Sequence, residues 1–292
     1  MILIGENINI MSTTIGAALK GREAGPVQEM ARAEAAAGMD YLDLNIGPAR
    51  REGDLLMDWT VRTVQAVSDN SLSLDTANPV AMEAGLKACR GRALINSISL
   101  QPERLGAELP LVTRYGAAMI GLLWGSEGMP RDAAERGVLA AELLYRTAES
   151  GIAGSDVWID PILTPITVGV NQIQSCLEFM GMLGDIAPEC QSVVGLSNVS
   201  NGVPRHLRPY LNRTCLMMLM KHGLKAAIVD AFDEELVDIA RGRKPELVKL
   251  VHSMMEGARP DISSLSPEEI KYVRTVRVLA GETLFSESWL ES

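Results

Sequence analysis

The sequence has few of the residues that build metal centres and disulfide scaffolds. Its 292 residues include four cysteines and three histidines. No two cysteines form a CxxC pair, and the histidines lack the spacing of a metal-binding set. Neither a zinc site nor a disulfide-stabilised scaffold is therefore expected.

Basic residues are also in the minority. Lysine and arginine total 27 against 37 aspartate and glutamate residues, which gives a formal net charge of −10. Nucleic acid and anionic membranes favour basic surfaces, so neither is expected as the main partner. The sequence contains no run of about 18 apolar residues, and its apolar start is interrupted at Glu6. We expect no membrane span and no signal peptide, and a reduced cytoplasmic location is the default.

Short aliphatic runs alternate with longer helical patterns along most of the chain. The runs are nearly unbroken apolar segments, which is typical of parallel strands covered on both faces. They lie at residues 2–5, 41–45, 72–75, 93–96, 118–123, 157–160, 193–197 and 226–230. Eight strand–helix units in about 250 residues predict an α/β fold, a single (β/α)8 TIM barrel. A doubly wound open sheet is the competitor, but residues 5–9 lack its glycine-rich turn.

Helical patterns fill the gaps between these strands. They are expected at residues 27–37, 79–87, 102–109, 131–150, 172–183 and 207–222. Further helices are expected at 233–241, 245–256 and 266–280, the last after a strong Ser-Pro-Glu-Glu start signal. Residues 1–292 are therefore expected to form one domain. Its barrel would span about 1–240, followed by a helical extension over about 241–292.

Almost every expected strand ends in a polar side chain. In chain order these are Glu6, Asn9, Asp43, Asn45, Asp75, Asn96, Asp160, Ser197, Asn198 and Asp230. Each of them also suits a turn or a helix cap, but in a barrel they would converge on one mouth, where active sites lie. No Lys, Arg or His ends a strand, which disfavours a Schiff-base aldolase, a phosphate-binding barrel and a transition-metal hydrolase. A magnesium site stays open. The set suits a flat, nitrogen-rich heterocycle.

Seven short stretches at these strand ends match one known family in order and position. They are residues 5–9, 42–48, 74–76, 95–97, 159–161, 195–200 and 226–230. In them the chain resembles the pterin-binding barrel family over about residues 1–240. Within that family it is similar to the methyltetrahydrofolate:corrinoid protein methyltransferases.

The resemblance implies pocket roles for seven positions. They are Asp75, Asn96, Asp160, Gly195, Ser197, Asn198 and Ile228. The first three are expected to hold the amino-pyrimidine edge of the pterin ring. Asn198 is expected to hydrogen-bond the methyl-bearing ring nitrogen. The other three would form the pocket wall, with Ile228 as an apolar neighbour of the ring.

The resemblance also implies an activity and a partner. The enzyme would move a methyl group between the ring nitrogen of methyltetrahydrofolate and the cobalt of a corrinoid protein, in a direction that the residues leave open. Tetrahydrofolate or methyltetrahydrofolate would be the substrate. A partner protein would carry the cobalamin or other corrinoid, because no histidine here lies in the expected Asp-x-His-x-x-Gly motif. Family members are usually homodimers, so a homodimer is expected.

Two alternatives stay open. Dihydropteroate synthase shares the barrel and resembles this chain at Asp75 and Asn96. It is expected to carry a basic Ser-Arg pair after the seventh strand, where this chain has Ser197-Asn198. An anionic leaving group would therefore lack a cation there. The second alternative is a non-catalytic module that binds a pterin or a corrinoid protein.

Overall fold

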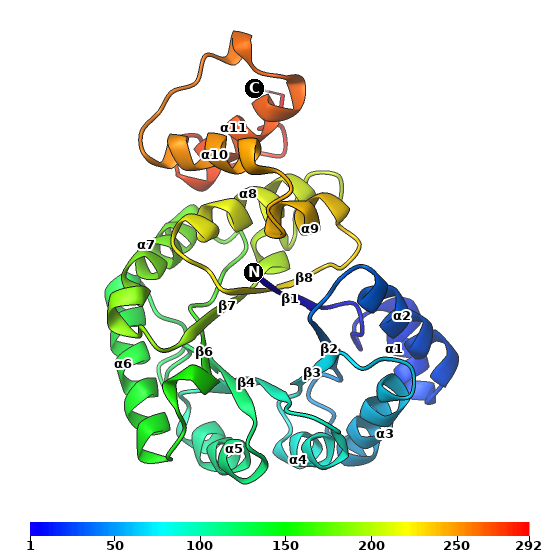
Figure 1. Ribbon diagram of the computed structural model, residues 1–292. Coiled ribbons are helices and arrows are strands. Elements are labelled where there is room, and N and C mark those ends of the chain that lie inside the picture. Colours follow the sequence, from blue (N-terminus) through cyan, green and yellow to red (C-terminus); the bar gives the residue numbers. More distant parts are fainter. Residues whose placement is uncertain (292) are drawn as a thin grey trace.

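The computed structural model describes residues 1–291, and its eight strands form a closed parallel barrel in the order β1 to β8. Figure 1 shows the barrel end-on, with helices around its outside. The strands are β1 (Ile2–Gly5), β2 (Tyr41–Asn45), β3 (Ser71–Asp75), β4 (Leu94–Ser99), β5 (Ala118–Leu122), β6 (Val157–Asp160), β7 (Gln191–Gly195) and β8 (Ala226–Val229). The predicted TIM barrel is confirmed.

The helices of the outer ring alternate with these strands. They are α1 (Thr13–Gly21), α2 (Ala24–Ala36), α3 (Gly53–Gln65), α4 (Pro79–Ala88), α5 (Pro102–Tyr115), α6 (Ala133–Glu149), α7 (Val170–Ile186) and α8 (Arg208–Lys221). Helices α1 and α3 are not among the predicted elements. Helix α5 runs through Pro110 instead of ending at residue 109, because burial of its apolar face outweighs the hydrogen bond that proline removes.

The inside of the barrel is filled by a small apolar cluster. Its buried members are Ile4, Leu94, Ala118, Ile120, Trp158, Val193 and Ala226. Side chains two positions apart on a strand face the same side. Asn96 follows Leu94 at this spacing and Asp160 follows Trp158, so both residues lie above the apolar cluster, at the carboxyl ends of the strands. This end is called the mouth below.

Three further helices follow the barrel: α9 (Glu234–Ala240), α10 (Pro245–Met255) and α11 (Pro267–Leu279). Helices α10 and α11 lie outside the ring and pack against α8 (Figure 1). Val251, Tyr272 and Trp289 belong to the same buried core cluster as the barrel's outer face. We therefore propose that the barrel and the extension are one folding unit. Among residues 1–291, no helix has the length and apolar character needed to cross a membrane.

Candidate active site

One side of the mouth is built from the ends of β2, β3 and β4. Asn45 pairs with Asp75 and Asp75 pairs with Asn96 in the sheet register, so the three side chains lie in a row. The Asn45 amide donates to the Asp75 carboxylate. Below this row, Asp43 accepts hydrogen bonds from Ser73 Oγ at 2.5 Å and from Asn96 Nδ2 at 3.0 Å. Asp43 therefore fixes the orientation of the Asn96 amide.

Burial makes both carboxyl groups on this side weak acids. The pKa of Asp43 rises to about 6 because the group is removed from water, although its two hydrogen bonds oppose the rise. The pKa of Asp75 lies well above its usual value, first through burial and then through the nearby charge of Asp43. A ligand that offers N–H donors would relieve this cost by stabilising the carboxylates.

Arg104, from α5, is a cation close to this side that the sequence did not single out. Its guanidinium donates to the backbone oxygens of Ala77 and Ser97, at 2.7 Å each. It thereby ties the loop that follows β3 to strand β4. Its charge also lowers the pKa of Asp75, in opposition to the effect of burial.

The other side of the mouth is formed by the end of β1 and by the short helix η2 (Leu196–Ser200), which follows β7. Ser197 Oγ donates to Glu6 Oε1 at 2.5 Å. Burial raises the pKa of Glu6 to about 7, the Ser197 hydrogen bond lowers it, and the charges of Asp230 and Asp43 raise it further. Glu6 can therefore hold a proton near neutral pH.

A buried glutamate on α2 supports this side from outside the barrel. Glu34 is fully buried and accepts the backbone N–H of Asn7 at 2.8 Å. Gly5 makes this approach possible, because a Cβ at that position would lie 2.5 Å from Glu34 Oε1. Burial raises the pKa of Glu34 to about 8. The residue type alone does not distinguish Glu34 from the exposed Glu29 of the same alanine-rich helix.

Asp160 lies at the end of β6, between the two sides. Its Oδ1 accepts the backbone N–H of Ile162 at 2.8 Å. Burial raises its pKa to about 6, while that hydrogen bond and the charge of Arg136 oppose the rise. The fully buried Arg136 binds the backbone oxygen of Pro161 at 2.8 Å and Ser175 Oγ at 2.6 Å. The segment that orients Asp160 is therefore fixed to α6 and α7.

Asn198 lies over the inner face of β7. A Cβ at Gly195 would be 3.0 Å from Asn198 Nδ2, so the glycine leaves room for this amide. Asn201 Nδ2 donates to Asn198 Oδ1 at 3.3 Å, which leaves Nδ2 of Asn198 available as a donor. Asn198 is exposed, and Ile228 is half-buried beside Gly195 in the register of β7 and β8.

The structure thus brings all seven predicted site residues to the mouth. Asp75 and Asn96 lie on one side and Asp160 lies between the two sides. The other four come from β7, η2 and β8. Asp43, Glu6 and Asn45 were recognisable as strand-end polar residues, but their hydrogen bonds to the predicted set appear only in the structure. In residues 1–291 no group of three or more His, Cys, Asp or Glu side chains could hold a metal ion.

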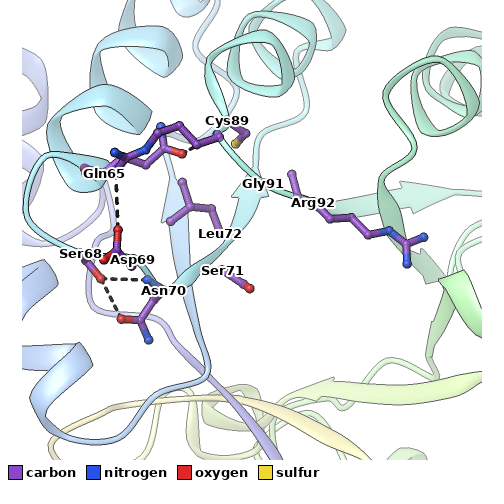
Figure 2. Close-up of a pocket in the computed structure, with 11 residues that line it drawn as sticks. Gln65, Ser68, Asp69, Asn70, Ser71, Leu72, Cys89, Gly91 and Arg92 are labelled. Carbon is purple, nitrogen blue, oxygen red and sulfur yellow. Dashed lines mark hydrogen bonds and ion pairs between the residues drawn. The ribbon is translucent and has the colours of Figure 1, made fainter.

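A second pocket, of about 190 Å³, lies at the opposite end of the barrel, where β3 and β4 begin. Figure 2 shows its lining, with Ser68 hydrogen-bonded to Asn70. Its ion pair, between Arg90 and Asp69, is exposed and has an N–O distance of 3.9 Å. Burial raises the pKa of Cys89 to about 11, so its thiol stays protonated at neutral pH. This pocket has no set of converging buried acids.

Comparison with known proteins places the chain in a family. The model of the pterin binding enzyme family matches residues 17–230, and the chain belongs to this family. Among curated proteins, it is 22% identical over 239 residues to the methylcorrinoid:tetrahydrofolate methyltransferase of Eubacterium limosum, covering 81% of this chain and 88% of that protein.

Two further relatives are larger or more distant. The methionine synthase of Mycobacterium tuberculosis is 29% identical over 213 residues, which cover 70% of this chain but only 18% of that protein. The dihydropteroate synthase of Thermus thermophilus superposes with a TM-score of 0.60 at 21% identity, covering 82% of this chain and 93% of the synthase chain. At that identity the structural likeness shows the barrel fold alone.

Proposed function

We propose that this protein is a methyltransferase that moves a methyl group between the ring nitrogen of methyltetrahydrofolate and the cobalt of a corrinoid protein. The observation that carries the proposal is the neutral amide of Asn198 at the end of β7, placed over Gly195 and next to the Ser197–Glu6 hydrogen bond. A neutral donor suits an amine leaving group, whereas a diphosphate leaving group calls for a cation.

The acids and amides of the mouth would hold the pterin ring. Asp75 and Asp160 would accept hydrogen bonds from the amino group and ring N–H groups of the pterin. Asn96, whose amide both donates and accepts, would pair with an edge of the pterin that carries a donor and an acceptor. Their raised pKa values support this assignment, because a ligand donor supplies the stabilisation that water no longer gives. Ile228 would contact the ring's apolar face.

The leaving nitrogen would need a proton or a hydrogen bond. As the carbon–nitrogen bond breaks, its electron pair stays on the ring nitrogen, and the methyl carbon bonds to cobalt(I) of the corrinoid protein. Asn198 Nδ2 would donate to this nitrogen, with a stronger hydrogen bond in the transition state than in the ground state. Glu6 would hold the proton that reaches the nitrogen through Ser197 or water. In the reverse direction, the same groups would accept the proton.

The corrinoid would arrive as a co-substrate on another protein. The exposure of Asn198 keeps this end of β7 open to such a partner. The relative named a methylcorrinoid:tetrahydrofolate methyltransferase supports this kind of partner. A homodimer in the cytoplasm is our expectation from the family resemblance.

The test is methyl transfer from methyltetrahydrofolate to reduced cobalamin, followed by absorbance. We expect Asn198→Ala to lower turnover by about 100- to 1,000-fold, the typical loss of a preorganised donor. The control is Asn171→Ala, an exposed asparagine at the start of α7. Turnover of Asn198→Ala within about threefold of the unmodified protein would contradict the role of Asn198. Pteroate formation from a pterin diphosphate would instead identify a synthase.

A further inference from the structure

Arg104 lies close to the row of side chains at the ends of β3 and β4, and it binds the backbone beside them. Its guanidinium donates to the backbone oxygens of Ala77 and Ser97, at 2.7 Å each. Ala77 lies two positions after Asp75 in the chain. Ser97 directly follows Asn96 on β4. One planar group therefore fixes the backbone next to two of the residues assigned to the pterin edge.

Arg104 does not bind the Asp75 carboxylate itself. Among residues 1–291, its ion pair is with Glu108, one turn further along α5, at 3.1 Å. In the same part of the chain, the Asp75 carboxylate accepts one hydrogen bond, from the Asn45 amide to Oδ2. A direct pair with Arg104 would occupy the oxygens that the pterin donors are proposed to use. The observed contacts give Asp75 a nearby positive charge and leave Oδ1 without a partner.

Asp160 has a similar arrangement at the end of β6. Arg136 Nε donates to the backbone oxygen of Pro161 at 2.8 Å, and its Nη2 donates to that of Ile162 at 3.4 Å. Within the described residues, Asp160 accepts one hydrogen bond, from the Ile162 N–H to Oδ1, and forms no ion pair with Arg136. Each of the two aspartates assigned to the pterin thus has an arginine that binds the adjacent backbone and leaves one carboxylate oxygen free.

Glu6, the acid that is proposed to hold a proton, has different neighbours. Burial favours the protonated form of all three acids, Glu6, Asp75 and Asp160. At Asp75 and Asp160 the positive charge of an arginine opposes this effect. At Glu6 the neighbouring charges are those of Asp230 and Asp43, which add to it. The arginines therefore lie near the acids that would accept hydrogen bonds as carboxylates, whereas the acid that would carry a proton has acidic neighbours.

We propose that Arg104 is a positioning residue for pterin binding, which stabilises Asp75 as a carboxylate and fixes the backbone beside it while leaving one carboxylate oxygen to the ligand. This inference rests on the proposed function, because the pterin is the ligand that the mouth would hold. Protonation of Asp75 would turn one acceptor oxygen into a donor, which would meet the ligand's own N–H donors. Arg104 thus acts on affinity through Asp75 and not by touching the ligand.

The groups around Asp75 and Arg104 determine how this effect depends on pH. The charges that act on Asp75 are those of Asp43 on β2 and Arg104 on α5, in opposite directions, and β4 places the neutral Asn96 beside it. Arg104 faces Glu108, whose pKa is raised by burial to about 7, although the charge of Arg104 opposes the rise. Below that pH, Glu108 is mostly protonated and offsets less of the positive charge. Removing Arg104 should therefore weaken binding most at mildly acidic pH and least at alkaline pH, where Asp75 is charged in either case.

Calorimetry of methyltetrahydrofolate binding at pH 6 and pH 9 tests this role. The variant is Arg104→Gln, and the matched control is Arg114→Gln in the last turn of the same helix, where Arg114 pairs with Glu83 at 3.0 Å. We expect Arg104→Gln to bind about 30-fold more weakly at pH 6 and only about threefold more weakly at pH 9. The smaller loss reflects the missing backbone contacts. Arg104→Lys keeps the charge and should lose about threefold at both pH values. The control should bind normally at both.

A double variant separates an effect through Asp75 from a general one. Asp75→Asn has no carboxyl group to protonate at this position, so adding Arg104→Gln to it should cause the same loss at pH 6 and pH 9. Equal losses at the two pH values in Arg104→Gln alone would assign the arginine a structural role and overturn the inference. A loss in Arg104→Lys that is confined to pH 6 would also overturn it, even if Arg104→Gln failed to fold, because the lysine keeps the charge.

These outcomes are distinct from a failure of the proposed function. If the unmodified protein bound no methyltetrahydrofolate at either pH, the proposed function would fail, and this inference with it. If the unmodified protein bound the folate and the effect of Arg104→Gln did not depend on pH, the proposed function would stand and only the role of Arg104 would be wrong.

Discussion

The two ends of the barrel differ in how far their charged groups are exposed to water. At the amino end, Asp69 and Arg90 are exposed and only 3.9 Å apart, so water solvates both. At the mouth, carboxyl groups are withdrawn from water, and burial raises the pKa of Glu6 to about 7 and of Asp160 to about 6. Strand β3 joins the two ends, from the exposed Ser71 to Asp75.

This difference indicates where binding takes place. A buried acid destabilises a fold unless something offsets its lost hydration. At the amino end the charged groups stay in water and keep their hydration. At the mouth several carboxyl groups are buried and lose it. Such clusters of perturbed acids are typical of functional sites. The comparison can be tested by changing one acid at each end and by changing the groups that position the mouth.

The largest effect is expected for Asp160→Asn. Replacing the carboxylate by an amide removes a charged acceptor and places an N–H₂ group against ligand donors. We expect the affinity for methyltetrahydrofolate to fall by about 30- to 100-fold, roughly 2–3 kcal/mol, measured by calorimetry. Asp69→Asn, at the amino end, is the matched control and should bind normally. Unchanged affinity in the Asp160 variant would contradict binding at the mouth. A loss of affinity in the Asp69 variant would indicate that the amino end takes part in binding.

Gly195→Ala tests the positioning of Asn198. The new Cβ would lie 3.0 Å from Asn198 Nδ2 and would displace the amide by a few tenths of an ångström. We expect kcat to fall about tenfold with a smaller change in KM, because the donor is misplaced more than the ring is. Combining Gly195→Ala with Asn198→Ala should add little to the loss caused by Asn198→Ala alone. Additive losses would show that Gly195 acts independently of Asn198.

Glu6→Gln tests whether the mouth supplies the proton. With its pKa raised to about 7, Glu6 is protonated below that pH and charged above it. Transfer from methyltetrahydrofolate should therefore fall about tenfold between pH 6 and pH 8 in the unmodified protein. In Glu6→Gln the rate should be lower and nearly independent of pH over this range. If the variant keeps the same pH dependence, another group provides the proton.

Glu34→Gln tests the cost of burial itself. Since the pKa of Glu34 is raised to about 8 in the folded protein, its contribution to stability is full below about pH 4.5 and is lost as the pH rises through about 8. Urea unfolding at pH 5 and at pH 8 gives the decrease in the free energy of unfolding between these two pH values. We expect this decrease to be smaller in Glu34→Gln than in the unmodified protein, by about 1 kcal/mol or more. Glu29→Gln, on the exposed face of α2, should behave like the unmodified protein. Equal losses in all three proteins would mean that Glu34 ionises freely.

The strands and the residues at their ends are the part of the molecule that the sequence predicts well. A parallel barrel strand is buried on both faces, so an apolar run such as residues 157–160 is visible without knowledge of its neighbours. The polar residue that ends each run is visible for the same reason. Helix α3 gives a weaker signal, because it starts after Glu52 in a left-handed conformation and without a side-chain cap. Helix α1 does begin at a Ser12 cap, but it is only 9 residues long.

The supporting residues of the mouth depend on distant contacts and are therefore hidden in the sequence. Glu34 becomes part of the mouth only because Gly5 allows it to reach Asn7. Arg104 binds the backbone of Ala77, which precedes it in the chain by 27 positions. Neither residue has a neighbour in sequence that suggests its partner. Their roles follow from the closure of the barrel, which the local pattern does not encode.

The packing of α8 has a consequence for attempts to trim this protein. One end of α8 borders a cavity beside the mouth, which Glu6 and Arg208 help to line, and its flank is covered by α10 and α11. His252 Nε2 on α10 donates to the backbone oxygen of Met217 on α8 at 2.8 Å. Truncation after the eighth strand unit would expose that apolar flank to water and loosen the helix beside the cavity. A protein shortened to the eight strand–helix units would therefore be prone to aggregate, even though its barrel of strands would be complete.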